Sequence, residues 1–201
     1  MKRTFFSLAL LLAVATLTAQ TKMTAREAAV KIADRILAST TYEFKNTKTG
    51  EIYKSVKKLP LDMDVKVACK YNNWHYTNGV TNMALMELGD KLGDKKYEKY
   101  VLKNMNFVFN EGNLDFFRKQ YDEAFKRDGW NAVRKLSWHM IFRGKRLDDN
   151  GPMGASLIEL QLKYPNDSFL GYINETAEHL NYGDPRLVDG TIARIWPHVN
   201  T

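Results

Sequence analysis

Hydrophobic residues recur at helical spacing through most of the chain, which predicts a succession of α-helices. The first expected helix starts at a capping-box pattern, Thr24-Ala25-Arg26-Glu27, and runs to about Ser39. Glycine, proline or an acidic residue stands near most helix ends, as expected for caps and breaks. The same period predicts further helices over residues 80–92, 95–109, 114–126, 130–142, 152–162 and 168–180.

Two segments between the first helices lack this period. Residues 42–61 are polar and include Gly50, so we interpret them as a surface connection, whereas residues 65–70 fit a helix or a strand equally well. No βαβ rhythm is visible, which argues against a parallel nucleotide-binding sheet. The sequence therefore predicts an all-α fold of helical hairpins, either a solenoid or a closed α/α toroid.

The first twenty residues are typical of a secretory signal peptide. Lys2 and Arg3 precede an apolar run, residues 5–17, and the small residues before Gln20 suggest cleavage near Ala19. The run is too short to span a bilayer, and no later stretch is apolar enough to do so. We expect a signal peptide over residues 1–20, one domain over residues 21–201, and export to the periplasm or the medium.

Composition narrows the classes of partner. The formal charge is +7, which falls to +5 once Lys2 and Arg3 are removed, and acidic residues separate the basic clusters. A nucleic-acid-binding protein usually has a denser basic stripe, so we expect a solvated surface or an anionic small substrate. Cys69 is the only cysteine and the histidines lack ligand spacing, so neither a metal nor a cofactor is expected.

Three predicted loops carry the residues suited to chemistry. Residues 146–154 (RLDDNGPMG) place two carboxylates and an amide before Pro152, which is tolerated at the first position of a helix. Residues 71–79 are dense in aromatic and amide groups, and residues 189–198 form the final loop. Alternate loops of antiparallel hairpins emerge at one end, so these three are expected to line a common rim.

The residues on that rim suit a sugar. Aromatic rings pack on the C–H face of a pyranose, while arginine and amide groups bind hydroxyls and carboxylates. Other roles are open: Asp149 can instead cap a helix, and the aromatic residues can belong to the core. The candidates are Trp74, Tyr76, Trp196, Asp148, Asp149, Arg194 and His198.

These segments together resemble a known enzyme family. WHYTNG at residues 74–79, RLDDNGPMG at residues 146–154, and Asp189-Gly190 followed by Arg194 and Trp196-Pro197 are similar to the unsaturated glucuronyl and rhamnogalacturonyl hydrolases, glycoside hydrolase families 88 and 105. The middle motif is moderately specific, and the order of all three is stronger evidence. The resemblance extends over most of the chain after the signal peptide.

The resemblance implies an (α/α)6 barrel and an acid-catalysed reaction. Members of the family remove a terminal uronic acid whose ring has a C4–C5 double bond, from oligosaccharides left by polysaccharide lyases. An aspartic acid protonates the enol ether, water adds, and the hemiketal collapses to release the sugar. By position, Asp149 matches the first active-site aspartate, with Asp148 as the alternative register; Trp74 and Tyr76 match the pocket wall, and Arg194 and His198 lie in the segment that contacts the sugar.

The chain departs from the family in one respect that affects activity. The resemblance implies a second aspartate, usually assigned as the proton donor, in a Trp-Asp motif that is absent here, and about seven predicted helices are too few to close the barrel. We therefore expect the N-terminal portion of such a barrel, which a further segment or a second copy would complete. A noncatalytic carbohydrate-binding or helical interaction module is the main alternative, and a lyase or epimerase is a weaker one.

Overall fold

The computed structural model describes residues 23–143, 147–183 and 185–193, with the backbone alone for Glu111, Arg143 and residues 147–149. The predicted signal peptide lies outside these residues. The chain divides into two compact units, residues 1–35 and 36–201. No helix within the described ranges is long and apolar enough to cross a membrane.

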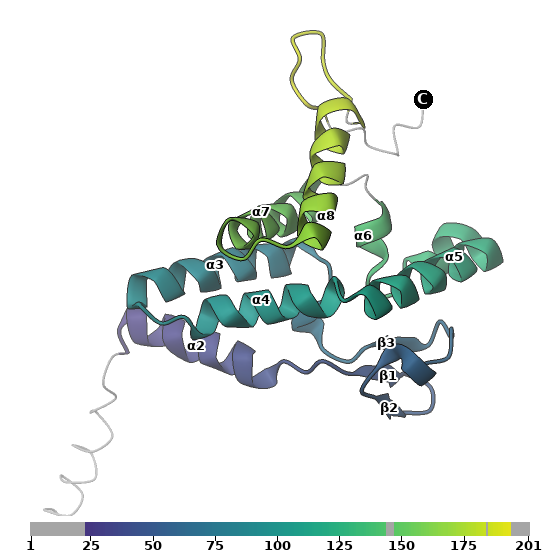
Figure 1. Ribbon diagram of the computed structural model, residues 1–201, viewed down its shortest axis with the longest axis horizontal. Helices are drawn as coiled ribbons and strands as arrows, with labels where there is room; N and C mark the ends of the chain where they lie inside the picture. The colour runs from purple at the N-terminus through teal and green to yellow at the C-terminus, as the bar shows by residue number, and fades with distance from the viewer. Residues whose placement is uncertain (1–22, 144–146, 184, 194–201) are drawn as a thin grey trace, which may run out of the picture. The chain divides into compact units, whose positions relative to one another are not determined.

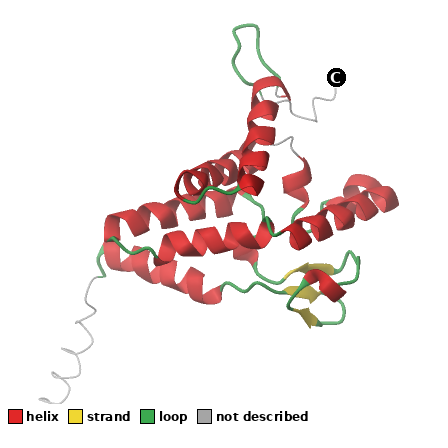
Figure 2. Ribbon diagram, viewed as in Figure 1, coloured by secondary structure: helices red, strands yellow, loops and turns green. Residues whose placement is uncertain are grey.

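Helices make up most of the described chain (Figures 1 and 2). This confirms the predicted all-α class and is consistent with an incomplete α/α barrel. A π-helical turn, His179–Gly183, follows the last α-helix. The α-helices are α2 (Ala25–Ser39), α3 (Tyr76–Leu92), α4 (Lys96–Val108), α5 (Glu111–Val133), α6 (His139–Arg143), α7 (Leu147–Lys163) and α8 (Asp167–Glu178).

The capping box predicted at the start of α2 is present. The Thr24 backbone N–H donates to Glu27 Oε2 (2.8 Å), and the Glu27 N–H donates to Thr24 Oγ1 (3.2 Å). These reciprocal bonds satisfy two of the donors that a helix start leaves free. The first helix therefore begins where the sequence predicts.

A small antiparallel sheet replaces the predicted surface connection. Gly50, with φ of 77°, turns the chain between the first two strands, and Phe44 and Asn46 point inward while Lys45 is exposed. The ambiguous residues after position 64 begin as a strand and continue to a 3₁₀ turn at Lys70–Asn72. Strands this short are missed because two or three residues do not establish a period of two. The strands are β1 (Phe44–Asn46), β2 (Ile52–Tyr53) and β3 (Val65–Val67), in the order β2-β1-β3 (Figure 2).

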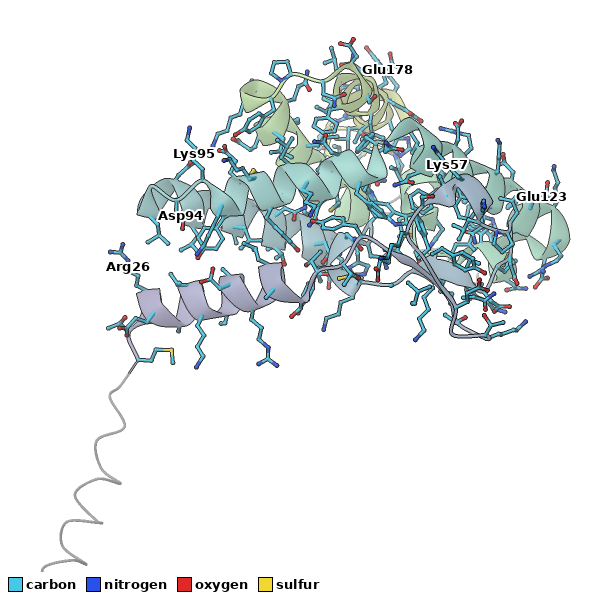
Figure 3. The ribbon with its side chains drawn as sticks, turned by 60° about the horizontal axis from the view of Figure 1, so that its bottom comes forward. Arg26, Lys57, Asp94, Lys95, Glu123 and Glu178 are labelled. Carbon is cyan, nitrogen blue, oxygen red and sulfur yellow. The ribbon has the colours of Figure 1, made fainter. Side chains whose placement is uncertain are left out.

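Three helices, α3, α4 and α7, pack side by side in the larger unit, with α3 making its most extensive contact with α7 (Figure 1). The turn between α3 and α4 is the one predicted: Gly93 caps α3 with φ of 65°, and Asp94 Oδ1 accepts from the Lys96 N–H. Figure 3 shows Asp94 and Lys95 at this turn.

The helices predicted over residues 114–126 and 130–142 are divided differently in the structure. One helix, α5, continues to Val133 with a kink at Asp128 and Gly129, whose φ is 49°. After Val133 the helix ends, and the side chains of Leu136 and Trp138 in the following segment are buried in the core. The short α6 follows this segment. The Asp-Gly pair was a correct sign of a break, but helical hydrogen bonding resumes after it.

An ion pair between a buried carboxylate and a more exposed lysine ties α4 to the end of α7. Glu98 is 8% exposed and accepts hydrogen bonds from Lys163 Nζ (2.6 Å) and from the Tyr164 hydroxyl. Lys163 Nζ also lies 3.3 Å from Asp90 Oδ1 on α3. Since a buried carboxylate depends on such partners, this cluster should contribute measurably to stability.

We expect Glu98→Gln to lower the free energy of unfolding at neutral pH by about 1–3 kcal/mol, because the amide has no charge to pair with Lys163 and only one acceptor oxygen for two donors. The Lys163 and Tyr164 hydrogen bonds hold the pKa of Glu98 below its usual 4.5. The stabilisation is therefore full above pH 4.5 and lost as the pH falls through the lowered pKa. Urea unfolding of both proteins at several pH values measures the difference.

The matched control is Glu87→Gln, at an exposed pair with Lys91 (2.9 Å) one helical turn away. Exposed pairs contribute little, so this variant should unfold within about 0.5 kcal/mol of the wild type. An equal loss in the two variants would contradict a special role for the buried carboxylate.

Candidate functional site

The first two motifs of the sequence meet where the start of α3 packs on α7. The indole Nε1–H of Trp74, just before α3, donates to Asn150 Oδ1 on α7 at 3.1 Å. The hydroxyl of Tyr172 on α8 donates to the same oxygen, also at 3.1 Å. One amide therefore joins three segments that are far apart in the sequence.

The backbones of the two motifs also approach closely. A Cβ atom placed on Gly79 would lie 2.4 Å from the carbonyl carbon of Pro152 and 2.5 Å from the nitrogen of Met153. Only glycine fits such a contact without a shift of the backbone. The glycine that closes the first motif is thus required by the proline of the second.

The junction between the two motifs is buried. Trp74 is 1% exposed and Asn150 is 6% exposed, and the Trp74 ring packs edge-on against Tyr172 and Phe109. Burial raises the pKa of the Tyr172 hydroxyl well above its usual value, so that group stays protonated and acts as a donor to Asn150. Hydrogen bonds in such surroundings are stronger than in water.

Trp74 and Tyr76, both predicted to contact substrate, lie in different surroundings. The Trp74 ring belongs to the core, which is the other role open to it from the sequence. Tyr76, the first residue of α3, is 44% exposed, and its ring lies 4.6 Å from the ring of His75. The structure therefore does not bring the two rings together in one wall.

The predicted loop at residues 146–154 is helical from Leu147 onward, which corrects the expectation that the helix starts at Pro152. Pro152 lies inside α7, where it has no N–H to donate to the Asp148 carbonyl. The buried bonds of Asn150 and the close contact at Gly79 hold this turn of helix despite that loss. Asp148 and Asp149 occupy its first turn, and their carboxyl groups lie outside the described part of the chain.

The third motif is described only in part. A bridge between Arg186 and Ile192 closes a hairpin whose turn includes Asp189 and Gly190, with φ of 86° at Gly190. The Arg186 guanidinium donates to the Gly190 carbonyl (2.9 Å), which fixes the base of the turn. The remaining candidates, Arg194, Trp196 and His198, lie outside the described residues.

Asn150 and Tyr172 complete the junction but were not among the predicted site residues. The sequence does give a signal for Asn150, because this residue lies inside the acidic motif at residues 146–154. Tyr172 had none, since one tyrosine on an amphipathic helix does not reveal its partner.

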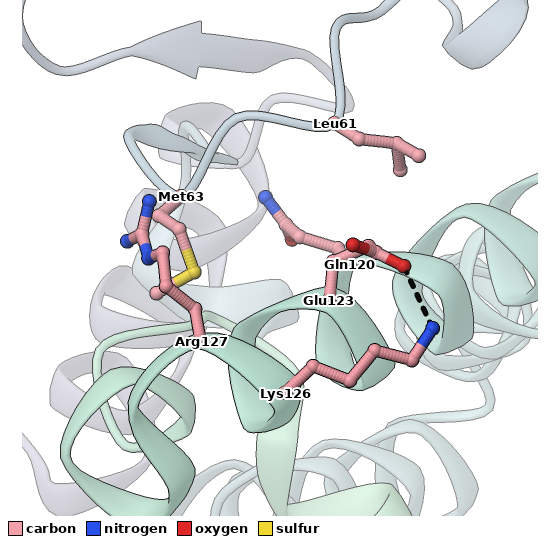
Figure 4. A pocket seen from close by; sticks show the side chains of 6 residues that line it. All are labelled: Leu61, Met63, Gln120, Glu123, Lys126 and Arg127. Atoms are coloured by element: carbon pink, nitrogen blue, oxygen red, sulfur yellow. Dashed lines mark hydrogen bonds and ion pairs between the residues drawn. The ribbon is translucent and has the colours of Figure 1, made fainter.

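A separate groove of about 470 Å³ lies between α5 and the loop before β3 (Figure 4). Gln120 ties the two sides by donating to the carbonyls of Asp62 (2.6 Å) and Val65 (2.9 Å). An ion pair between Glu123 and Lys126 (3.0 Å) lies along its edge. Neither Trp74 nor Tyr76, the two predicted site residues with described side chains, lines this groove.

Further properties bear on the class of protein. Among the described residues, no three histidine, cysteine, aspartate or glutamate side chains gather as metal ligands. No protein-family model and no curated protein sequence matches the chain.

Proposed function

We propose that this protein is a glycoside hydrolase that removes a terminal 4,5-unsaturated uronic acid from oligosaccharides produced by polysaccharide lyases. The observation that carries the proposal is the junction of the first two motifs. Trp74 and Asn150 are bonded across 76 positions of sequence, and Gly79 contacts Pro152. Motifs that act in one site have to meet in the fold, and these two do.

In this proposal Asp149, with Asp148 as the alternative, acts as the general acid, the role that the resembling family usually gives to its second aspartate. The carboxylic acid gives its proton to C4 of the enol ether, and a water oxygen bonds to C5 as its own proton leaves for a base. The resulting hemiketal opens to a ketone and releases the leaving sugar. A carboxyl that remains protonated near neutral pH is needed for the first step, as in other general-acid sites.

The buried residues then have a positioning role. Asn150 follows Asp149 directly, and its amide is fixed by Trp74 and Tyr172. Trp74 is thus proposed to orient the first turn of α7 rather than to contact the sugar. The exposed ring of Tyr76 is the described candidate for sugar contact, with Arg194, Trp196 and His198 as further candidates for the ring and its carboxylate.

The test is the ultraviolet absorbance of the unsaturated uronate. Purified protein is mixed with lyase-digested pectin or glycosaminoglycan oligosaccharides, and the absorbance should fall as the double bond is hydrated. A rise in absorbance with intact polysaccharide would instead indicate a lyase, because a lyase forms this double bond. Constant absorbance with both kinds of substrate would contradict a hydrolase.

A noncatalytic carbohydrate-binding or helical interaction module is the second candidate. The groove beside α5 supports it, since Leu61 and Met63 offer apolar surface there while Lys126 and Arg127 offer positive charge (Figure 4). A binding module should retain oligosaccharides without changing their absorbance, and binding should survive Asp149→Asn.

A further inference from the structure

A small cavity lies beside the first motif, in the larger unit. Its volume is about 10 Å³, about the space of a single water molecule. Amide side chains dominate its wall, which is unusual for a protein interior, where such groups are expected to be hydrogen-bonded. The cavity is lined by Tyr71, Asn72, Asn73, Asn78, Asn82, Asn104, Met105, Val108, Trp138 and Met153.

Four polar atoms of residues in this wall are buried and meet no hydrogen-bond partner among the described residues: Asn72 Oδ1, Asn73 Oδ1, Asn104 Nδ2 and Trp138 Nε1. Asn72 is 3% exposed and Trp138 is 2% exposed, so bulk solvent does not reach them. A buried polar atom without a partner costs about 1–3 kcal/mol. Four such atoms, two acceptors and two donors, on residues around one cavity point to a ligand that satisfies them together.

The orientation of the Asn72 amide is set by its other end. Asn72 Nδ2 donates to the Thr41 carbonyl at 2.7 Å, and a flipped amide would place two oxygens against each other there. Oδ1 of Asn72 is therefore an acceptor at the cavity. The indole N–H of Trp138 can only donate.

We propose that this cavity binds one water molecule as a structural ligand. The water accepts from Trp138 Nε1–H and from the Asn104 amide N–H, and donates its two hydrogens to Asn72 Oδ1 and Asn73 Oδ1. Buried waters in proteins make about two to four hydrogen bonds, and a cavity of about 10–15 Å³ holds one. Four hydrogen bonds and the observed volume both agree with one water molecule.

The water joins elements that carry the first motif to the rest of the core. Asn72 and Asn73 stand at the 3₁₀ turn before α3, Trp138 stands just before α6, and Met105 and Val108 come from α4. The start of α3 is held by Trp74 on one side and by this water on the other. The proposed water site does not depend on the proposed hydrolase activity and is tested separately from it.

The test is nuclear Overhauser transfer between water and the tryptophan indole protons in the full-length protein. A water held for longer than nanoseconds gives cross-peaks of opposite sign in the laboratory-frame and rotating-frame experiments. Trp74 is the internal control: it is buried to the same extent as Trp138, but its N–H bonds directly to Asn150. We expect the bound-water cross-peak at the Trp138 indole proton and none at that of Trp74.

Crystal structures of the wild type and of Trp138→Phe provide a second measurement. The wild type should show one density peak within hydrogen-bond distance of Trp138 Nε1 and Asn72 Oδ1. In Trp138→Phe, which removes the donor and widens the space, that peak should be lost or displaced. A Trp138 indole proton without a water cross-peak, or an indole that donates directly to a protein oxygen in the crystal, would overturn the proposal.

Discussion

Asp149→Asn should slow the loss of unsaturated-uronate absorbance by about 10²–10⁴-fold, the range that a general acid contributes. The amide keeps the size of the carboxyl but cannot deliver a proton to the enol ether. Asn150, next in the chain, keeps its bonds to Trp74 and Tyr172, so the start of α7 should be undisturbed. Initial rates at saturating oligosaccharide, with circular dichroism as a check on folding, measure the effect.

Asp148→Asn is the matched control, because it makes the same chemical change one residue earlier in the first turn of α7. If Asp149 is the acid, Asp148→Asn should keep most of the activity. A large loss in Asp148→Asn alone would move the acid by one residue and keep the proposed reaction. Full activity in both variants would contradict the proposal that this motif supplies the general acid.

The helices were predictable from sequence because their signal is local. The capping box at Thr24 and the turn at Gly93 and Asp94 each involve residues within a few positions of one another. All residues of each cap can therefore be recognised together in the sequence. The small sheet was missed for the opposite reason. The pairing of Phe44 with Val67 is long-range, and its strands are too short to show a pattern.

The candidate site was predictable in composition but not in arrangement. The motifs at Trp74 and Asn150 were identified, but whether Trp74 faces a sugar or the core depends on a partner 76 positions away. The sequence likewise predicts that a helix starts at Pro152, whereas the structure places this proline inside α7. Its backbone there lies against Gly79 of another helix, a contact that local sequence rules do not reveal.

Gly79→Ala should destabilise the protein by about 3 kcal/mol, at the upper end of the usual cost of overpacking. Helix propensity alone predicts the reverse, since alanine inside a helix is better than glycine by about 0.5–1 kcal/mol. The new methyl group, however, would lie 2.4 Å from the backbone of Pro152. A backbone cannot yield as a flexible side chain does, so α3 and α7 have to separate. Urea unfolding, compared through the midpoint and the slope, measures the change.

Gly171→Ala is the matched control, since Gly171 is also helical, in α8, but has no neighbouring atom within 4 Å of its added Cβ. Gly171→Ala should be stabilised by the higher helix propensity of alanine. The two substitutions should therefore change the free energy of unfolding in opposite directions. Because the motifs meet at Gly79, its variant should also lose hydrolysis under conditions where it is still folded, while Gly171→Ala keeps it. Equal stability of the two variants would mean that α3 and α7 do not touch at this glycine, and the contact that supports the proposed site would be absent.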